Sequence, residues 1–281
     1  MLLHILTVEQ PDALLFCFDE GEDTFRHLEH KEYKAGRAET PDDFYVQIPR
    51  VLDLIHAFSI KHVSDPHFEA DDLLCAYGRA AEAQGMKVTI VTGDRDALQL
   101  ADEHIRIAIP HKGYQQAEYL GPKEIETKYG VRPDQIPSYK GLMGDASDNL
   151  PGVKGIGPKG AAELLQQFGS LEGIYAHLDQ VRPAVRTKLE HDREQAFFCE
   201  RMAQLVSEIP LAIPLEGLSL QNLPADPVVQ FFRAMEFTML IKRFQSLLQS
   251  PFGRACFAAS SLPAEEPKPQ AIGEKQMTLF S

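Results

Sequence analysis

Residues 87–96 read Lys-Val-Thr-Ile-Val-Thr-Gly-Asp-Arg-Asp, a β-branched strand that stops at a Gly-Asp turn. Just upstream, residues 69–84 have the pattern of a helix, and a glycine follows it. The apolar run at 13–18 predicts another strand, buried on both faces of a parallel sheet, and a further strand is expected at 104–108. Strands that alternate with helices predict an α/β fold with a mostly parallel sheet flanked by helices.

The second part of the chain has a different pattern, in which no further strands are predicted. Its predicted helices cover residues 122–129, 137–143, 158–168, 171–178 and 193–207. The last thirty or so residues are rich in Pro, Ser and Glu, which is typical of a disordered tail. We therefore divide the chain into an α/β domain at 1–120, a helical region at 121–248 and a tail at 249–281.

The composition sets outer limits on the function. The chain has 281 residues and 44% hydrophobic residues, so global disorder is excluded and a proper core is expected. No apolar run reaches the roughly 18–20 residues of a membrane helix, and the first residues do not resemble a signal peptide. The four cysteines are scattered without a CxxC pair, which favours a reducing cytoplasm over a disulfide framework or a zinc site.

Acidic residues follow the predicted strands or begin the next helices. They are Asp19, Glu69, Asp71, Asp72, Asp94, Asp96, Asp145 and Asp148. Because the carboxyl ends of parallel strands share one edge of a sheet, we expect these side chains to converge there. Carboxylates without His or Cys suit Mg²⁺ or Mn²⁺, and two such ions roughly 3.5–4 Å apart would serve phosphodiester hydrolysis.

Each of these acids also has an ordinary explanation, since Asp in the first turn of a helix is often a cap or a partner of the helix dipole. Four acidic groups at one sheet edge are harder to explain in that way. The net charge of −13, from 28 basic and 41 acidic residues, would by itself argue against nucleic acid. Setting the eight acids aside leaves 33 against 28, a balance of −5, which is compatible with a locally basic DNA-binding face.

Residues 150–162 read Leu-Pro-Gly-Val-Lys-Gly-Ile-Gly-Pro-Lys-Gly-Ala-Ala, which resembles a helix-hairpin-helix. Glycines let backbone amides approach a phosphate, and the helix that begins at Pro158 adds a favourable dipole. Such contacts hold the sugar-phosphate backbone without reading its sequence. The positions expected at DNA are Gly152, Lys154, Gly155, Gly157 and Lys159. The alternative is a tight turn between two helices without a ligand.

Taken in order, these motifs resemble the 5′-nuclease family. That family includes the nuclease domain of bacterial DNA polymerase I, stand-alone 5′–3′ exonucleases and flap endonucleases. The matching segments are Phe18-Asp19, Thr24-Phe25-Arg26, Tyr33-Lys34, Arg37, Glu69-Ala70-Asp71-Asp72, Thr92-Gly93-Asp94-x-Asp96, Gly144-Asp145-x-Ser147-Asp148-Asn149 and the hairpin. The resemblance covers roughly residues 1–248 and implies a PIN-like nuclease fold, here as a stand-alone protein.

The resemblance also implies roles for the acidic residues. Asp19, Glu69, Asp71 and Asp72 would hold or orient a first divalent ion. Asp94 and Asp96 would bridge towards a second ion, which Asp145 and Asp148 would complete. Among them Asp71 and Asp96 are expected to be directly catalytic, together with two basic residues of a helical arch.

Those basic residues are Lys34 and Arg37, which the resemblance expects to polarise the scissile phosphate and to guide the free 5′ end. Tyr33 could stack on a base, and Arg26 is a further candidate for phosphate contact. A solvated helix face is the alternative for Lys34 and Arg37. The family also holds K⁺ on hairpin carbonyls, which match two other positions, Val153 and Ile156.

One departure from the family pattern concerns the beginning of the chain. The family normally opens with an apolar strand ending in Asp-Gly-Asn, whose Asp is a metal ligand, and this sequence begins within the helix expected after it. Either the start codon is placed too late or the chain is a truncation. The alternative function is therefore a catalytically impaired, DNA-binding and clamp-tethered protein. A PIN-type RNA nuclease would lack the hairpin at 150–162, so it is disfavoured.

The end of the chain, Gln276-Met277-Thr278-Leu279-Phe280-Ser281, resembles a bacterial sliding-clamp-binding peptide. Its anchors would be Gln276, Leu279 and Phe280 on a flexible tether, and a frayed terminus is the alternative. The expected protein is a monomeric, cytoplasmic, nucleoid-associated nuclease. It would act on DNA with a free 5′ end, a flap or a nick during replication and repair, and it would have no membrane partner.

Overall fold

The computed structural model describes residues 1–21, 24–36 and 41–258. Arg37 and the predicted clamp-binding residues Gln276, Leu279 and Phe280 lie outside these ranges. No helix of the described residues is long and apolar enough to cross a membrane.

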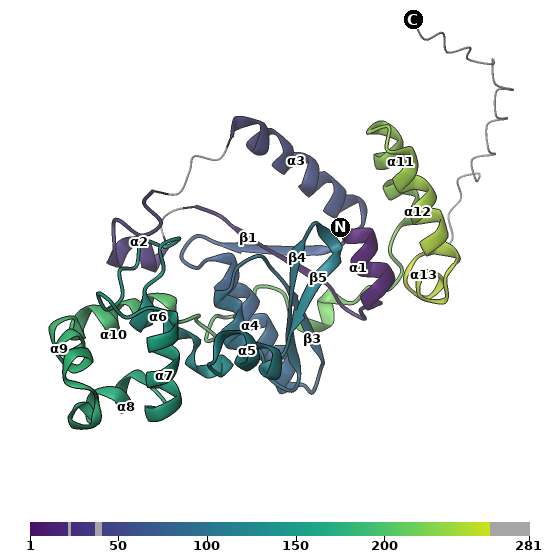
Figure 1. Ribbon diagram of the computed structural model, residues 1–281. Coiled ribbons are helices and arrows are strands. Elements are labelled where there is room, and N and C mark those ends of the chain that lie inside the picture. Colours follow the sequence, from purple (N-terminus) through teal and green to yellow (C-terminus); the bar gives the residue numbers. More distant parts are fainter. Residues whose placement is uncertain (22–23, 37–40, 259–281) are drawn as a thin grey trace, which may run out of the picture.

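The first half of the chain alternates helices and strands (Figure 1). Its elements are α1 (Leu2–Glu9), β1 (Leu15–Asp19), α2 (Phe25–Glu29), α3 (Asp42–Ala57), β2 (Lys61–Asp65), α4 (Ala70–Ala83), β3 (Val88–Val91), the 3₁₀ helix η1 (Asp96–Leu100), β4 (Ile105–His111) and β5 (Gly113–Leu120). The strands that the sequence predicted at 13–18, 87–92 and 104–108 are β1, β3 and β4, and the helix predicted at 69–84 is α4.

The second half is helical in the described residues, as predicted. Its α-helices are α5 (Pro122–Tyr129), α6 (Ile136–Met143), α7 (Pro158–Phe168), α8 (Leu171–Ala176), α9 (Pro183–His191), α10 (Arg193–Ala203), α11 (Ala225–Ala234), α12 (Thr238–Gln249) and α13 (Pro251–Cys256). Short 3₁₀ helices lie at η2 (Pro133–Gln135), η3 (Leu178–Gln180) and η4 (Leu215–Leu218). The predicted start of the tail at residue 249 is too early, because α13 extends to Cys256.

The strands of the described residues form two small sheets in place of the one sheet that the sequence predicted. In one sheet β1 pairs with β2 in parallel, and in the other β3 pairs with β4 in parallel and β4 with β5 antiparallel. Helix α4 contacts β1, β2 and β3, so it packs on both sheets. The expectation that β1 is buried on both faces is wrong, because its apolar side chains stay partly exposed.

Helix α4 forms where the sequence predicts it for local reasons. The Glu69 side chain accepts from the backbone at the third helical position, Asp72 accepts from the backbone amide of Glu69, and together they make a capping box. The buried face of the helix includes Leu73 and Tyr77, whereas Gly85, at φ +75°, follows its end. Two acids of the predicted site are therefore placed by the start of this helix.

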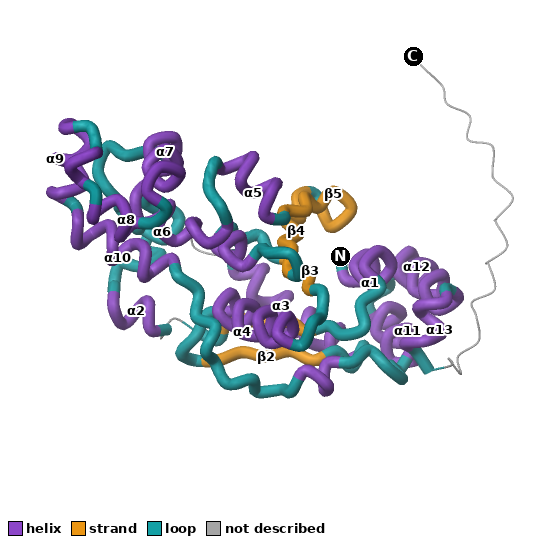
Figure 2. The backbone as a smooth tube through the Cα atoms, turned by 90° about the horizontal axis from the view of Figure 1, so that it is seen from below, coloured by secondary structure: helices purple, strands orange, loops and turns teal. Residues whose placement is uncertain are grey.

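The last three helices pack on the first half of the chain and not on the helical region that precedes them. One hydrophobic core joins Leu6 of α1 and Ile55 of α3 to Phe232 of α11 and Phe244 of α12. Figures 1 and 2 show α11–α13 beside α1 at one end of the molecule and α7–α9 at the other. The division predicted at residue 120 therefore does not separate two independent cores, because α11 and α12 pack on α1 and α3.

Helix α1 is attached to the β4–β5 hairpin through Glu9. Its carboxylate accepts from the hydroxyls of Tyr114 at 2.6 Å and Tyr119 at 2.7 Å, and pairs with Arg106 at 2.6 Å. Burial would raise the pKa of Glu9, but these hydroxyls and the guanidinium more than offset it, so the pKa lies below its ordinary value. The ionised carboxylate therefore stabilises the folded state.

We expect Glu9→Gln to lower the free energy of unfolding at pH 7 by about 1–2 kcal/mol, because it removes the charge that accepts these hydrogen bonds. A lowered folded-state pKa contributes stability above the unfolded value of about 4.3, and that stability is lost as the pH falls. Urea unfolding at pH 7 and below pH 4 measures the difference, which should shrink in acid. Glu103→Gln, at an exposed position, is the matched control; equal effects of the two changes would contradict the role of Glu9.

Candidate active site

The predicted acidic residues come from four separate segments of the described chain. Asp19 ends β1, and Glu69 caps α4 with Asp71 and Asp72 in its first turn. Asp94 follows β3, Asp96 begins η1, and Asp145 and Asp148 lie in the turn after α6. Short contacts connect the segments. The carboxylate of Asp19 accepts from the amide of Ala70 at 2.8 Å, and the Tyr33 hydroxyl lies 3.3 Å from Glu69 and 3.5 Å from Asp148.

Asp71 shows that these carboxylates interact. Burial, followed by the negative charges of Asp94, Asp19 and Glu69, raises the pKa of Asp71 to about 7, although Lys34 opposes the shift. Three of the four acidic segments therefore meet around this side chain. At neutral pH a divalent cation would favour its ionised form.

The donor set fits a hard divalent cation, because it offers carboxylate oxygens without Cys or His. The side chains are not arranged as a finished cage: among the residues described, no group of three or more His, Cys, Asp or Glu side chains is positioned to hold a metal ion. Instead, the ammonium groups of Lys34 and Lys140 form ion pairs with these carboxylates. The residues that could hold ions are Asp19, Glu69, Asp71, Asp94, Asp96, Asp145 and Asp148.

Lys34 is one of these basic side chains. Its ammonium lies 2.5 Å from Glu69, and its backbone amide donates to the carbonyl of Asp148 at 3.1 Å. The backbone at Lys34 is left-handed, with φ +58°, which is uncommon for a residue other than glycine. The predicted catalytic lysine thus lies at the edge of the acidic cluster.

Lys140 is a second such residue, and it was not predicted from the sequence. Its ammonium contacts both Asp96 and Asp145, the latter at 2.6 Å, and the residue is only 8% exposed. Burial raises the pKa of Asp145, but the charge and hydrogen bond of Lys140 and the bonds from Ser147 more than offset it and keep that pKa low. The available signal was a lysine five residues before Asp145, within an otherwise apolar helix.

Arg26 and Asp72 occupy a different place from the one predicted. Arg26 is 1% exposed and pairs with Asp72 through two bonds of 2.6 and 2.9 Å; it also donates to the carbonyls of Met202 and Gln204. Asp72 is fully buried and accepts further bonds from the amides of Glu69 and Val206. Phosphate contact by Arg26 and direct metal ligation by Asp72 are therefore contradicted, because neither side chain reaches solvent.

The prediction that Tyr33 stacks on a base is wrong for a similar reason. The residue is buried, and its hydroxyl faces Glu69 and Asp148. Burial and these two carboxylates raise the pKa of Tyr33 far above its usual range, so the hydroxyl stays protonated and can donate. Tyr33 therefore contacts the acidic cluster from the protein interior and donates to its carboxylates.

The hairpin predicted at 150–162 is present: residues 150–157 form the turn and residues 158–162 begin α7. Gly155, Gly157, Lys154 and Lys159 are exposed and available to a phosphate. Gly152 is buried, so the prediction that it contacts DNA is wrong. The backbone of Gly152 is left-handed, with φ +63°, and an added Cβ would lie only 2.2 Å from the amide nitrogen of Gly144. This position therefore admits no side chain.

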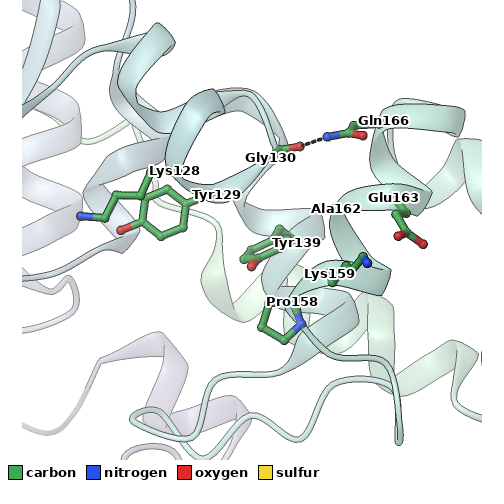
Figure 3. Close-up of a pocket in the computed structure, with 9 residues that line it drawn as sticks. All are labelled: Lys128, Tyr129, Gly130, Tyr139, Pro158, Lys159, Ala162, Glu163 and Gln166. Carbon is green, nitrogen blue, oxygen red and sulfur yellow. Dashed lines mark hydrogen bonds between the residues drawn. The ribbon is translucent and has the colours of Figure 1, made fainter.

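A cavity of about 380 Å³ opens beside the hairpin, between α5, α6 and α7 (Figure 3). Its lining includes Lys128, Tyr139 and Lys159, and a hydrogen bond of 2.7 Å from Gln166 to the carbonyl of Gly130 closes one side. None of the predicted metal-binding acids lines it. The cavity therefore belongs to the hairpin region, with two lysines at its rim.

Comparison with known families identifies both parts of the chain. Residues 1–130 match the "5′-3′ exonuclease, N-terminal resolvase-like domain", and residues 131–226 match the "5′-3′ exonuclease, C-terminal SAM fold". The chain belongs to the 5′–3′ exonuclease family. The family supports the predicted PIN-like fold with a helical second region, in which the hairpin lies.

Curated relatives of this exonuclease-family chain include two bacterial DNA polymerases I. The Bacillus subtilis enzyme is 37% identical over 244 residues, and the Bacillus caldotenax enzyme is 35% identical over 270 residues. These alignments cover 86% and 95% of this chain but 28% and 31% of the polymerases. The chain thus spans less than a third of the length of these relatives.

Solved structures support the fold of the family. A bacteriophage T5 5′-exonuclease with bound zinc matches with a TM-score of 0.62 and 18% identity over 88% of both chains. A T5 flap endonuclease in complex with DNA and metal ions gives 0.63 and 18%, covering 89% of this chain and 88% of that one. The catalytic core of Rad2 with DNA substrate gives 0.53 and 16%, covering 90% and 82%.

Proposed function

We propose that this chain is a structure-selective, divalent-metal-dependent 5′–3′ exonuclease and flap endonuclease that hydrolyses DNA phosphodiesters in replication and repair. The observation that carries the proposal is the meeting of acidic side chains from three segments around Asp71, with a fourth segment linked to them through Lys140, in a chain that also presents an exposed hairpin. The family match supports 5′–3′ exonuclease activity, and the flap endonuclease fold supports action at a free 5′ end, a flap or a nick.

In the proposed reaction, two Mg²⁺ or Mn²⁺ ions would supply an activated water and stabilise the charge that develops on the phosphate. Asp71, Asp94 and Asp96 would hold and orient the ions, with Asp19, Glu69, Asp145 and Asp148 around them. Lys34, and Arg37 as predicted from the sequence, would polarise the scissile phosphate. The hairpin would anchor the duplex through Lys154, Gly155, Gly157 and Lys159.

We also propose a K⁺ site on the hairpin, through the carbonyls of Val153 and Ile156. Both residues are buried, and the carbonyl of Val153 already accepts from the amide of Ile156 at 3.0 Å. A carbonyl oxygen has a second lone pair for a cation. We further propose that the protein acts as a monomer in the cytoplasm, in association with the nucleoid.

A second candidate function is a DNA-binding protein with impaired cleavage. It is favoured by the pairing of β1 along only one edge in the described residues and by the ion pairs of Lys34 and Lys140 with carboxylates that would hold metal. Cleavage of a labelled 5′-flap duplex with Mn²⁺ or Mg²⁺, and with EDTA as a control, separates the two functions. Metal-dependent release of the flap supports the nuclease; DNA binding without cleavage supports the alternative.

For the last residues of the chain we keep the proposal of a sliding-clamp contact through Gln276, Leu279 and Phe280. Replacing Leu279 and Phe280 by Ala, or deleting residues 276–281, is expected to reduce clamp binding by at least about tenfold, because both apolar anchors are lost. Cleavage of free flap DNA should stay within about twofold. Co-sedimentation with the clamp measures the effect, with Lys275→Ala as the control; unchanged clamp binding would refute the proposal.

A further inference from the structure

One face of the α9–α10 segment lies against the hairpin. The side chains that contact the hairpin backbone recur at intervals of four, three and four residues, from α9 across the junction at Asp192 into α10. They are Lys188, Asp192, Gln195 and Cys199. We call this set the hairpin bracket.

The bracket holds Gly152 from both sides. Its amide donates to the sulfur of Cys199 at 3.4 Å, and its carbonyl accepts from the side chain of Gln195. Cys199 is fully buried, so this donor would be unpaired without the sulfur. The two contacts hold Gly152 in a left-handed backbone conformation, which a residue with a side chain would adopt there only with strain.

Gly152 in turn lies against the turn that carries the acids. An added Cβ at Gly152 would lie 2.2 Å from the nitrogen of Gly144, and one at Gly144 would lie 2.6 Å from the carbonyl oxygen of Leu150. Asp145 and Leu150 exchange two backbone hydrogen bonds, of 2.7 and 2.8 Å. A shift of the hairpin would therefore be transmitted to Asp145 by backbone contacts.

The outer half of the bracket holds the exposed tip of the hairpin. Asp192 accepts from the amide of Lys154 at 2.8 Å, and its other oxygen bonds His191 at 2.7 Å. Lys188 lies over Gly155 and donates to its carbonyl at 2.9 Å. Lys188 thereby adds a third ammonium to those of Lys154 and Lys159 on this part of the surface.

We propose that Asp192 is a positioning residue for DNA binding. It holds the amide of Lys154, and with it the exposed tip of the hairpin, in the conformation that receives the sugar-phosphate backbone. The inference rests on the proposed role of the hairpin in DNA binding. Asp192 is an acid on a face that would meet phosphates, so its removal has opposite consequences under the two simplest views: a purely electrostatic role predicts tighter binding, whereas a positioning role predicts weaker binding.

The test uses the full chain with three variants: Asp192→Ala, Asp192→Asn and Glu190→Ala. Asn keeps an oxygen acceptor for Lys154 but loses the charge. Glu190 is an exposed acid two residues away whose one ion pair in the described chain, at 3.9 Å, is with Arg186, so its loss changes the charge without touching the hairpin. Hydrogen exchange of amides 150–158 and binding of nicked duplex DNA in EDTA are measured for each variant.

We expect Asp192→Ala to speed exchange at the Lys154 amide by about tenfold and to weaken duplex binding by about tenfold. Asp192→Asn should stay within about threefold of the parent in both, and Glu190→Ala should bind equally well or slightly better. Unchanged exchange, or tighter binding by Asp192→Ala, would overturn the positioning role. Faster exchange with unchanged affinity would instead contradict the role of the hairpin in DNA binding.

Discussion

Asp96→Asn is expected to lower cleavage of a 5′-flap duplex by roughly a thousandfold while leaving DNA affinity within about threefold. The change removes one charge from the acidic cluster but almost no volume. Lys140, which contacts Asp96, keeps Asp145 as its partner at 2.6 Å, so the surroundings remain paired. The exposed hairpin, which would hold the duplex, is not altered. Catalysis should therefore fail without loss of binding.

Single-turnover cleavage at saturating enzyme, with Mn²⁺ or Mg²⁺, measures the chemical step, and binding of the same DNA in EDTA measures affinity. Asp134→Asn is the matched control, because Asp134 lies on the surface, where it pairs with Arg132. That variant should cleave like the parent chain. A parallel loss of cleavage and binding in Asp96→Asn would show that Asp96 acts on the fold or on the DNA surface, and would remove it from the proposed metal site.

Arg26→Met is expected to lower the free energy of unfolding by about 3–5 kcal/mol, because it leaves the fully buried Asp72 without its cation. The same substitution removes the donors to the carbonyls of Met202 and Gln204, and these bonds join α2 to the end of α10. The loss of stability should be larger than for breaking a surface ion pair, since no solvent reaches the remaining charge of Asp72.

Urea unfolding followed by circular dichroism measures this loss. Arg132→Met, which breaks the exposed pair with Asp134, is the control and should cost less than about 1 kcal/mol. The double variant Arg26→Met with Asp72→Leu should recover much of the loss, because neither charge then remains buried. A single variant as stable as the parent would mean that Asp72 does not depend on Arg26, and would reopen its assignment as a metal ligand.

Local signals account for the parts of the fold that were predicted correctly. The β-branched run of β3, the capping residues of α4 and the glycines before α7 each specify their own structure over a few residues. Strand β5 was missed because its sequence, with Gln115, Gln116 and Glu118, lacks a continuous apolar run. Its position is set by antiparallel pairing with β4, which a local pattern does not reveal.

In the candidate site, too, local patterns predicted some residues correctly, whereas the positions of others depend on distant partners. Acid type and spacing were enough to predict that Asp71 and Asp94 lie near each other, because each follows a strand or begins a helix, although the strands belong to two sheets and not to one. Arg26 and Tyr33 were assigned to the DNA surface because a basic or aromatic residue in a polar segment has the same local pattern whether it is exposed or buried. Their burial depends on partners 36 to 178 residues away.

The sequence alone predicted an acidic cluster, a glycine-rich hairpin with exposed lysines and the family to which the chain belongs, since each depends on residue types at short spacing. Tertiary structure alone determined that Lys140 joins two acidic segments, that Arg26 neutralises Asp72, and that α9–α10 holds the hairpin. These are contacts between distant segments, and their formation depends on how helices pack around a common core. Long-range packing, and not local propensity, therefore sets which charges meet and which remain at the surface.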